Sequence, residues 1–319
     1  MSRKILSLKA KNNTAPEGGE QPLKDDSNGD PLKRFENGVA IHPAPGISLE
    51  LGSDTHTARA MDLLTPIGFG QRGLIVAPPG CGKSTLLKHV CQAVGEAYPE
   101  VKLYALLIDE RPEEVTDFKR SVPAEVHASS SDESYEQHVK VANELLKRAR
   151  KEAGQGHNVM IVIDSLTRLA RVHNVETKGS GRTMSGGMDV RAMEIPRRLF
   201  GAARNIEDGG SLTILATILA DTGSQMDQVI LEEFKGTGNM EIVLSRNIAS
   251  QRIFPAVDIA KSSTRREELL IKPKDAKGIR TLRRALTHLK PVEGASKLVE
   301  LMDKYPTNAE LLKYVLSKV

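Results

Sequence analysis

Long apolar runs alternate along this chain with segments whose apolar residues recur every three to four positions. A continuous apolar run is typical of a parallel strand buried on both faces, and apolar residues at helical spacing indicate a helix with one core-facing side. Leu86, Leu87, Val90 and Val94 form such a stripe directly after the first run. Strands are predicted at 74–77, 103–108, 159–163, 212–217 and 240–244. Alternating strands and helices predict an α/β fold, with a mostly parallel central sheet flanked by helices and right-handed crossovers.

Shorter elements complete this pattern. Small strands are expected at 39–41 and 47–51, where apolar residues lie between Pro and Gly. A helix through Val115 and Phe118 should lead to a short strand near 126–128. Residues 134–153 predict a long helix with a heavily charged outer face.

Three parts follow from this reading. Residues 1–30 have few large apolar side chains to offset their ordering entropy, which predicts a disordered N-terminal tail. Residues 31–66 form a short linker that leads into the core. Residues 67–319 form the principal domain, with a basic helical end from Ile271 onward.

The composition is that of an ordinary globular protein, with 39% hydrophobic and 27% charged residues. A net charge of +4 permits a polyanionic partner without requiring one. No apolar run approaches the roughly 20 residues of a transmembrane helix, and no secretory signal follows the basic start, so we expect no membrane partner. The two cysteines, Cys81 and Cys91, flank the start of one helix, which favours reduced thiols and a cytoplasmic location.

The stretch from Leu74 to Thr85 combines a buried strand, a Gly/Pro-rich loop and a helix start. This order is typical of a phosphate-binding P-loop, whose backbone N–H groups and helix dipole favour anions. Lys83 would reach the β- and γ-phosphates, and the Ser84 hydroxyl would bind Mg²⁺. Ala77 stands where the usual pattern has its first glycine. The nucleotide contacts expected in this loop are Pro79, Gly80, Cys81, Gly82, Lys83, Ser84 and Thr85.

Two carboxylates follow predicted strands at the edge where ligands of parallel sheets bind. Asp164 ends the strand at 159–163 and is the second candidate for Mg²⁺, the alternative being a cap on the next helix. Glu110 follows the strand at 103–108 and could polarise the water that attacks the γ-phosphate. A surface salt bridge between Glu110 and Arg111 is the alternative for this residue.

Several arginines follow the last core strand, namely Arg246, Arg252, Arg265 and Arg266. A guanidinium supplied by a neighbouring subunit stabilises phosphoryl transfer in many motors, although scattered surface arginines would look the same. Two glycine-rich loops, 178–187 and 234–239, each carry a basic residue and could follow a nucleic-acid backbone by charge. Solvated loops without a partner are the alternative.

Several long stretches together resemble the motor domain of the transcription termination factor Rho family. The matching stretches are 71–79, 107–116, 164–171, 200–205, 209–214, 232–241, 252–256 and 264–270. The resemblance runs from about Phe35 to Leu270, and more weakly to the C-terminus. It implies a RecA-like P-loop NTPase that forms a homohexameric ring and hydrolyses ATP when stimulated by single-stranded RNA. Ala77 is shared with that family.

The resemblance also implies roles for individual residues. Lys83 and Ser84 would bind phosphate and Mg²⁺, Asp164 would be the Walker B acid, and Glu110 the catalytic carboxylate. Phe254 would pack on adenine. Arg265 matches an arginine finger supplied in trans, with Arg252 as a second such residue, and the roles of Arg168 and Arg246 stay open. Arg182 and the Lys235–Gly236 pair match two RNA-contacting loops.

Two departures from the family are expected to matter. The family normally carries an N-terminal domain that captures single-stranded RNA, and here we expect only the tail before the motor. Gly80 stands where the family often has a lysine. Alternatives are therefore a nucleotide-dependent RNA-binding or regulatory module without translocation, and a RecA-like rotary or export-type ATPase. Contact with RNA polymerase is left open, and a GTPase is excluded because no Asn-Lys-x-Asp motif is present.

Overall fold

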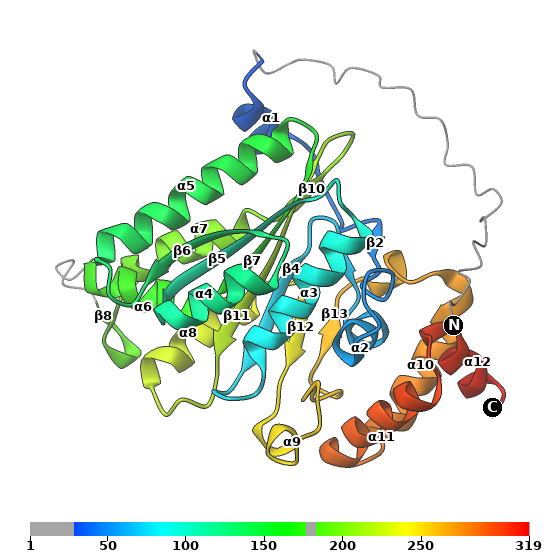
Figure 1. The fold of residues 1–319 in the computed structure, drawn as a ribbon. Coiled ribbons are helices and arrows are strands. Elements are labelled where there is room, and N and C mark those ends of the chain that lie inside the picture. The colour runs from blue at the N-terminus through cyan, green and yellow to red at the C-terminus, as the bar shows by residue number, and fades with distance from the viewer. Residues whose placement is uncertain (1–28, 177–182, 319) are drawn as a thin grey trace, which may run out of the picture.

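The computed structural model describes residues 29–176 and 183–318. Within these residues the centre of the molecule is a nine-stranded sheet (Figure 1). Its main path runs in the order β13 (Ser263–Thr264), β12 (Met240–Val243), β4 (Arg72–Ala77), β11 (Ser211–Leu219), β7 (Asn158–Asp164), β5 (Lys102–Glu110) and β6 (Glu125–Ser130). Neighbours from β12 to β6 pair in parallel, which confirms the mostly parallel sheet. Antiparallel pairs add β13 at one edge, and β10 (Arg204–Ile206) with β1 (Ala40–Ile41) beside β11.

Helices cover both faces of this sheet (Figure 1). One core contains side chains of α2 (His56–Leu64), α3 (Lys83–Ala97), α4 (Pro112–Ser121), α9 (Arg246–Ser250), α10 (Pro273–Thr287), α11 (Pro291–Lys304) and α12 (Asn308–Leu316). The other contains side chains of α1 (Pro31–Asn37), α5 (Tyr135–Gly154), α6 (Leu166–Glu176), α7 (Glu194–Gly201) and α8 (Gln225–Lys235). In β4, Ile75 and Ala77 enter the first core, and Leu74 and Val76 the second. Because both faces of these strands are buried, successive residues along each strand are apolar.

The five main strands, the short strand near 126–128 and the long helix over 134–153 are confirmed. The strand expected at 47–51 is wrong beyond Ile47, because β2 (Gly46–Ile47), which pairs with β3 (Ile67–Gly68), ends there. The Asp62 carboxylate accepts hydrogen bonds from the backbone N–H groups of Leu49 (2.9 Å) and Glu50 (3.0 Å). Those donors are therefore not free to pair with another strand.

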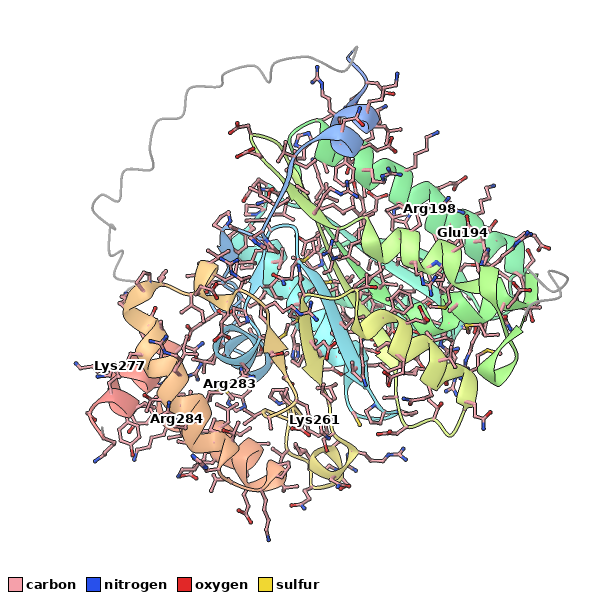
Figure 2. The ribbon with its side chains drawn as sticks, turned by 180° about the vertical axis from the view of Figure 1, so that it is seen from behind. Glu194, Arg198, Lys261, Lys277, Arg283 and Arg284 are labelled. Atoms are coloured by element: carbon pink, nitrogen blue, oxygen red, sulfur yellow. The ribbon has the colours of Figure 1, made fainter. Side chains whose placement is uncertain are left out.

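The helical end of the chain is confirmed, and buried arginines attach it to the rest of the molecule. Arg59 of α2 is 2% exposed and donates to the carbonyl oxygens of Met302 (2.7 Å) and Tyr305 (2.6 Å). Arg283 of α10 points inward and donates to the carbonyl oxygen of Leu64 at 2.7 Å (Figure 2). Burial lowers the pKa of both guanidinium groups.

The domain limits at residues 30 and 66 remain predictions, and most of the expected tail, residues 1–28, lies outside the described residues. Among the described helices, none combines the length and the apolar character needed to cross a bilayer. Cys81 and Cys91 are both free and buried.

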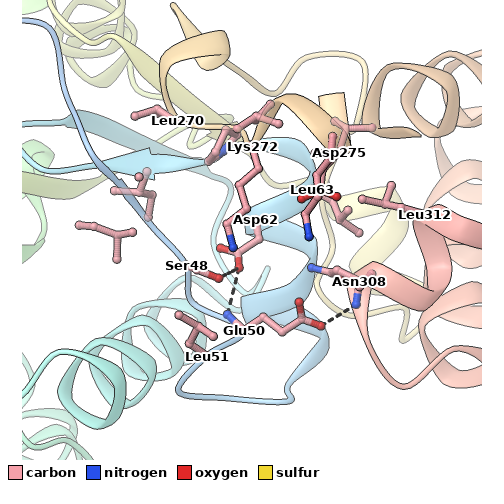
Figure 3. Close-up of a pocket in the computed structure, with 18 residues that line it drawn as sticks. Ser48, Glu50, Leu51, Asp62, Leu63, Leu270, Lys272, Asp275, Asn308 and Leu312 are labelled. Carbon is pink, nitrogen blue, oxygen red and sulfur yellow. Dashed lines mark hydrogen bonds between the residues drawn. The ribbon is translucent and has the colours of Figure 1, made fainter. Parts of the chain in front are cut away.

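A cavity of about 250 Å³ lies between the 46–51 segment, α2 and the C-terminal helices (Figure 3). Polar groups at its wall include Ser48, Glu50, Asp62 and Asn308, and Glu50 accepts a hydrogen bond from the Asn308 N–H at 2.6 Å. Burial raises the pKa of Asp62 to about 6. No residue of the P-loop lines this cavity, so the candidate nucleotide site lies elsewhere.

Candidate nucleotide site

The loop between β4 and α3 has the backbone geometry of an anion site. Gly80 (φ 78°) and Gly82 (φ 87°) are both left-handed, a conformation that glycine adopts without strain. Gly82 is the N-cap of α3, and its side-chain-free position leaves the first N–H groups of the helix without a capping bond. These N–H groups and the helix dipole suit a phosphate. The departure at Gly80 is compatible with this geometry, because a positive φ favours glycine there.

Lys83 lies at the centre of a polar cluster behind this loop. Its Nζ is 2.7 Å from both carboxylate oxygens of Asp164, 3.3 Å from Ser84 Oγ and 3.8 Å from Glu110 Oε2. Asp164 is 2% exposed and also accepts hydrogen bonds from Ser84 Oγ (3.1 Å) and Thr217 Oγ1 (2.8 Å). The structure therefore brings together four residues that the sequence predicted, Glu110 from β5, Asp164 from β7, and Lys83 and Ser84 from α3.

The alternative of Asp164 as a helix cap is wrong, since Ser165 Oγ accepts the N–H of Arg168 at the start of α6 (3.2 Å). The Ser84 hydroxyl and the Asp164 carboxylate instead present neighbouring oxygen atoms. Among the described residues no group of three or more His, Cys, Asp or Glu side chains converges. Mg²⁺ in phosphate sites needs only one or two protein oxygens besides water and phosphate, so the residues present fit this ion.

Glu110 is aimed at the cluster by a bulge at the end of β5. Asp109 has φ 54°, and the pairing with β6 shifts between Ile108 and Glu110. Glu110 is 4% exposed, and its Oε2 has no hydrogen-bond partner among the described residues. Burial raises the pKa of Glu110, whereas the nearby Lys83 lowers it. A buried carboxylate oxygen that accepts no hydrogen bond from the described residues, with only the Lys83 ammonium 3.8 Å away, is suited to accept a proton from a water molecule.

The pairing of Glu110 with Arg111, which the sequence left open, is not formed. Glu110 Oε1 instead accepts a hydrogen bond from Arg168 at 3.2 Å. Arg168 also donates to the carbonyl oxygen (2.6 Å) and the carboxylate (3.2 Å) of Asp109. This arginine therefore holds both residues of the bulge, a role that the sequence did not reveal.

An aromatic ring lies beside the loop. Phe254 is 43% exposed, and its ring would be 3.7 Å from a Cβ atom placed on Gly82. Arg246, at the start of α9, donates to the carbonyl oxygen of Pro79 at 3.2 Å. Arg252 is exposed two residues before Phe254. An exposed ring next to a phosphate loop can stack on a base.

Arg265 is distant from its own P-loop. Its backbone N–H bonds the carbonyl oxygen of Asn239 (2.8 Å), and the Asn239 side chain accepts the N–H of Arg72 at the start of β4 (2.9 Å). The P-loop follows the other end of that six-residue strand, about 20 Å away. The exposed Arg265 side chain therefore cannot reach the phosphates bound to its own subunit.

The two loops expected to contact RNA lie at opposite ends of α8, as far as the structure describes them. Arg182 lies outside the described residues, but the adjoining hairpin of β8 (Thr183–Met184) and β9 (Met188–Asp189) packs on the first turn of α8. There, a Cβ atom on Gly186 would approach Met226 N to 2.8 Å. Lys235 ends the same helix about 15 Å away, and its ammonium is 3.2 Å from Glu232. The turn at 220–224, which the sequence reading missed, lies next to the start of α8 instead.

Comparison with known proteins agrees with this geometry. The ATP synthase alpha/beta family, nucleotide-binding domain, matches residues 57–264. Transcription termination factor Rho of Haemophilus influenzae is 48% identical over 282 residues, which cover 88% of this chain and 67% of that protein. The Rho proteins of Aquifex aeolicus (49%) and Bacillus subtilis (46%) align over 88% and 96% of this chain, and over 66% and 69% of their own length. The chain thus spans about two thirds of these curated relatives.

Solved structures support the fold. A prototypical ATPase of the type III secretion system of pathogenic bacteria superposes with a TM-score of 0.71 and 25% identity, over 87% of this chain and 85% of that chain. The assembled type III secretion ATPase of enteropathogenic E. coli, in complex with its central stalk, gives a TM-score of 0.67 and 28% identity, over 80% and 60%. The RecA-like P-loop fold is therefore confirmed.

Proposed function

This chain belongs to the transcription termination factor Rho family, and from that premise we propose that it is a ring-forming ATPase driven by single-stranded RNA. The observation that carries the proposal is the cluster of Lys83, Asp164 and Glu110 behind the P-loop. These three side chains supply a phosphate ligand, a metal ligand and a base in one place.

Nucleotide binding requires Lys83 to move from Asp164 to the phosphates. The backbone N–H groups of the loop hold the phosphate oxygens, and Phe254 stacks on the adenine. Ser84 and Asp164 would hold Mg²⁺, which would supply positive charge to the phosphate oxygens. Lys83 then adds its positive charge on the β- and γ-phosphates.

Hydrolysis begins with Glu110, whose Oε2, which has no hydrogen bond among the described residues, accepts a proton from the attacking water. Arg168 holds the other oxygen of that carboxylate and keeps it oriented. Burial raises the pKa of Glu110, while the charge of Lys83 lowers it and favours the ionised form.

We assign Arg265 to the active site of a neighbouring subunit, because it lies at the far end of β4 from its own P-loop. A guanidinium that stabilises the transferring phosphate often arrives in trans. Arg252 is a second candidate for such a contact. Such a site is complete only between subunits, which supports a ring, and we propose a hexamer. The free thiols of Cys81 and Cys91 suit a reducing, cytoplasmic environment.

RNA contacts are assigned to one end of α8. The hairpin at 183–189 and the turn at 220–224 meet there, beyond the carboxyl end of β11, where parallel sheets bind ligands. The loop that contains Arg182 adjoins this hairpin. Lys235 and Gly236, at the other end of the helix, are proposed as a second contact.

One alternative has support from a specific observation. The type III secretion ATPases share the fold, so an export-type ATPase without RNA dependence is the second candidate. Their identity of 25–28% is well below the 46–49% of the Rho relatives, which favours the RNA-dependent motor.

Turnover measured with and without polyuridylate RNA at low salt tests the proposal. RNA should accelerate phosphate release, and Glu110→Gln should slow both the basal and the stimulated rate at least about 100-fold. Hydrolysis that polyuridylate, polyadenylate and single-stranded DNA all leave unchanged would favour the export-type alternative. RNA binding without any hydrolysis would favour a regulatory module.

A further inference from the structure

Helix α10 presents basic side chains on the face opposite to its buried face. Its buried residues are Gly278, Ile279, Leu282 and Leu286, and Gly278 packs against Leu312 of α12. Four exposed residues recur every three or four positions on the other side, namely Lys274, Lys277, Arg280 and Arg284. We call these four residues the basic row.

The positive charge of the chain is concentrated around this helix. Seven Lys and Arg residues and one acidic residue, Asp275, lie between Lys272 and Lys290. That segment carries a formal charge of +6, while the whole chain carries +4. The remainder of the chain is therefore slightly acidic, and this helix is a local site of positive potential.

The basic row has no structural task of its own. Within the described part of the chain, none of its four side chains forms an ion pair or a hydrogen bond. The adjacent Arg283, by contrast, points inward to backbone carbonyls, whereas Lys277 and Arg284 lie on the outer side of α10 (Figure 2). Arg148 of α5, which is also exposed, pairs with Glu125 and Glu152.

Resting on the proposed function, we propose that the basic row binds the phosphate backbone of single-stranded RNA, as a site additional to the RNA contacts at α8. Its charges extend about 15 Å along the helix, in steps of about 5 Å, and so match a chain of regularly spaced anions. A protein partner would need apolar area at the centre of its interface. No large apolar side chain is exposed anywhere on α10, which disfavours that occupant.

Fluorescence anisotropy of a labelled 12-nucleotide uridine RNA tests the site in the full chain across a salt series. One variant replaces Lys274, Lys277, Arg280 and Arg284 with Gln. The matched control replaces with Gln four exposed lysines of α11, α12 and the residues that follow α12, namely Lys297, Lys304, Lys313 and Lys318. Thermal unfolding confirms that both variants are folded. A photocrosslink from 4-thiouridine RNA gives a second readout by locating the attached peptides.

The row variant should bind RNA about tenfold more weakly at low salt, and its plot of log K against log salt should be shallower by about 3 units, because each contact contributes about 0.7. The control should change little, and crosslinks should map to residues 272–290. Equal losses of RNA affinity in both variants, or crosslinks confined to 183–236, would overturn the RNA site at the basic row. RNA-stimulated hydrolysis would in that case still support the proposed function. Displacement of RNA by polyglutamate as readily as by unlabelled RNA would overturn the assignment to RNA. Absence of RNA binding by the unmodified chain would overturn both proposals.

Discussion

The ammonium of Lys83 lies 2.7 Å from both carboxylate oxygens of Asp164, a side chain that is 2% exposed. The lysine that should hold the phosphates therefore neutralises the acid that should hold the metal. On the proposed function, nucleotide binding would exchange this ion pair for contacts with phosphate and Mg²⁺. The two residues are thus coupled in stability as well as in catalysis.

Lys83→Met should abolish hydrolysis and lower the free energy of unfolding of the nucleotide-free protein by about 3–5 kcal/mol, because it leaves Asp164 buried and unpaired. Adding Asp164→Asn should restore much of that loss. Urea unfolding of the two single variants and the double variant measures the coupling. Lys88 and Asp117 form a more exposed ion pair that also involves α3 and serve as the control, with a coupling below about 1 kcal/mol. Additive changes in the free energy of unfolding for the Lys83 and Asp164 variants would contradict the ion pair.

Glu110→Gln should slow hydrolysis at least about 100-fold, since a positioned base contributes that much or more. Nucleotide affinity should persist, because Lys83, Ser84 and the P-loop backbone are unchanged. Single-turnover hydrolysis and the binding of a fluorescent ADP analogue separate the two effects. Glu113→Gln, an exposed carboxylate in the first turn of α4, is the control. Unchanged turnover in Glu110→Gln would leave this residue a structural partner of Arg168.

The sequence predicted the parts of the fold that depend on local pattern. The strands at 74–77 and 159–163 are buried on both faces, so their apolar runs were unambiguous. The two-residue strand β13 and the three-residue strand β10 had no such signal, because they form only by pairing at an existing edge. The Asp62 carboxylate likewise ended β2 from 13 residues away in the chain, an effect that no local window contains.

The residues of the candidate site likewise include some that a local motif predicts and others whose place depends on contacts between distant parts of the chain. Lys83, Ser84 and Asp164 follow from a local motif and a strand end, and the structure brings them together. Arg168 was not assigned a role, because its partners Asp109 and Glu110 are almost 60 residues away. The position of Lys235 relative to the hairpin at 183–189 depends on the length of α8 rather than on glycine content.

Subunits with Arg265→Ala and subunits with Lys83→Ala should each be inactive, yet a mixture should recover part of the activity. In the mixture, an Arg265→Ala subunit retains Lys83 and Glu110 and meets a neighbour with an intact Arg265. A mixture of Lys83→Ala with Glu110→Gln is the control and should stay inactive, because every site lacks a residue in cis. Hydrolysis rates over a range of mixing ratios measure the recovery. Full activity of Arg265→Ala alone would contradict the role in trans.

The stability of the protein should depend on pH through Asp62. Its pKa in the folded protein is raised from 3.8 to about 6 by burial, so the native state binds more protons than the unfolded state between these values. The contribution of Asp62 to stability is therefore greatest below pH 3.8 and is lost as the pH rises through 6. From pH 4 to pH 7, the Tm of the wild type should accordingly fall relative to the Tm of Asp62→Asn. A constant difference across this range would contradict the raised pKa.

Variants at the two ends of α8 distinguish the proposed RNA contacts. Gln225→Glu adds a negative charge at the end that contacts the hairpin, and should reduce RNA-stimulated turnover while sparing the basal rate, since the hydrogen bonds and ion pairs of the polar cluster do not involve Gln225. Lys235→Ala removes one cation at the other end and should lower the salt slope of RNA binding by about 0.7. Gln155→Glu, an exposed change of the same type at the end of α5, is the control and should change neither quantity. Because RNA phosphates repel a carboxylate directly, the Gln225 variant should show the larger loss of stimulation. A loss confined to Lys235→Ala would move the principal contact to the C-terminal end of α8.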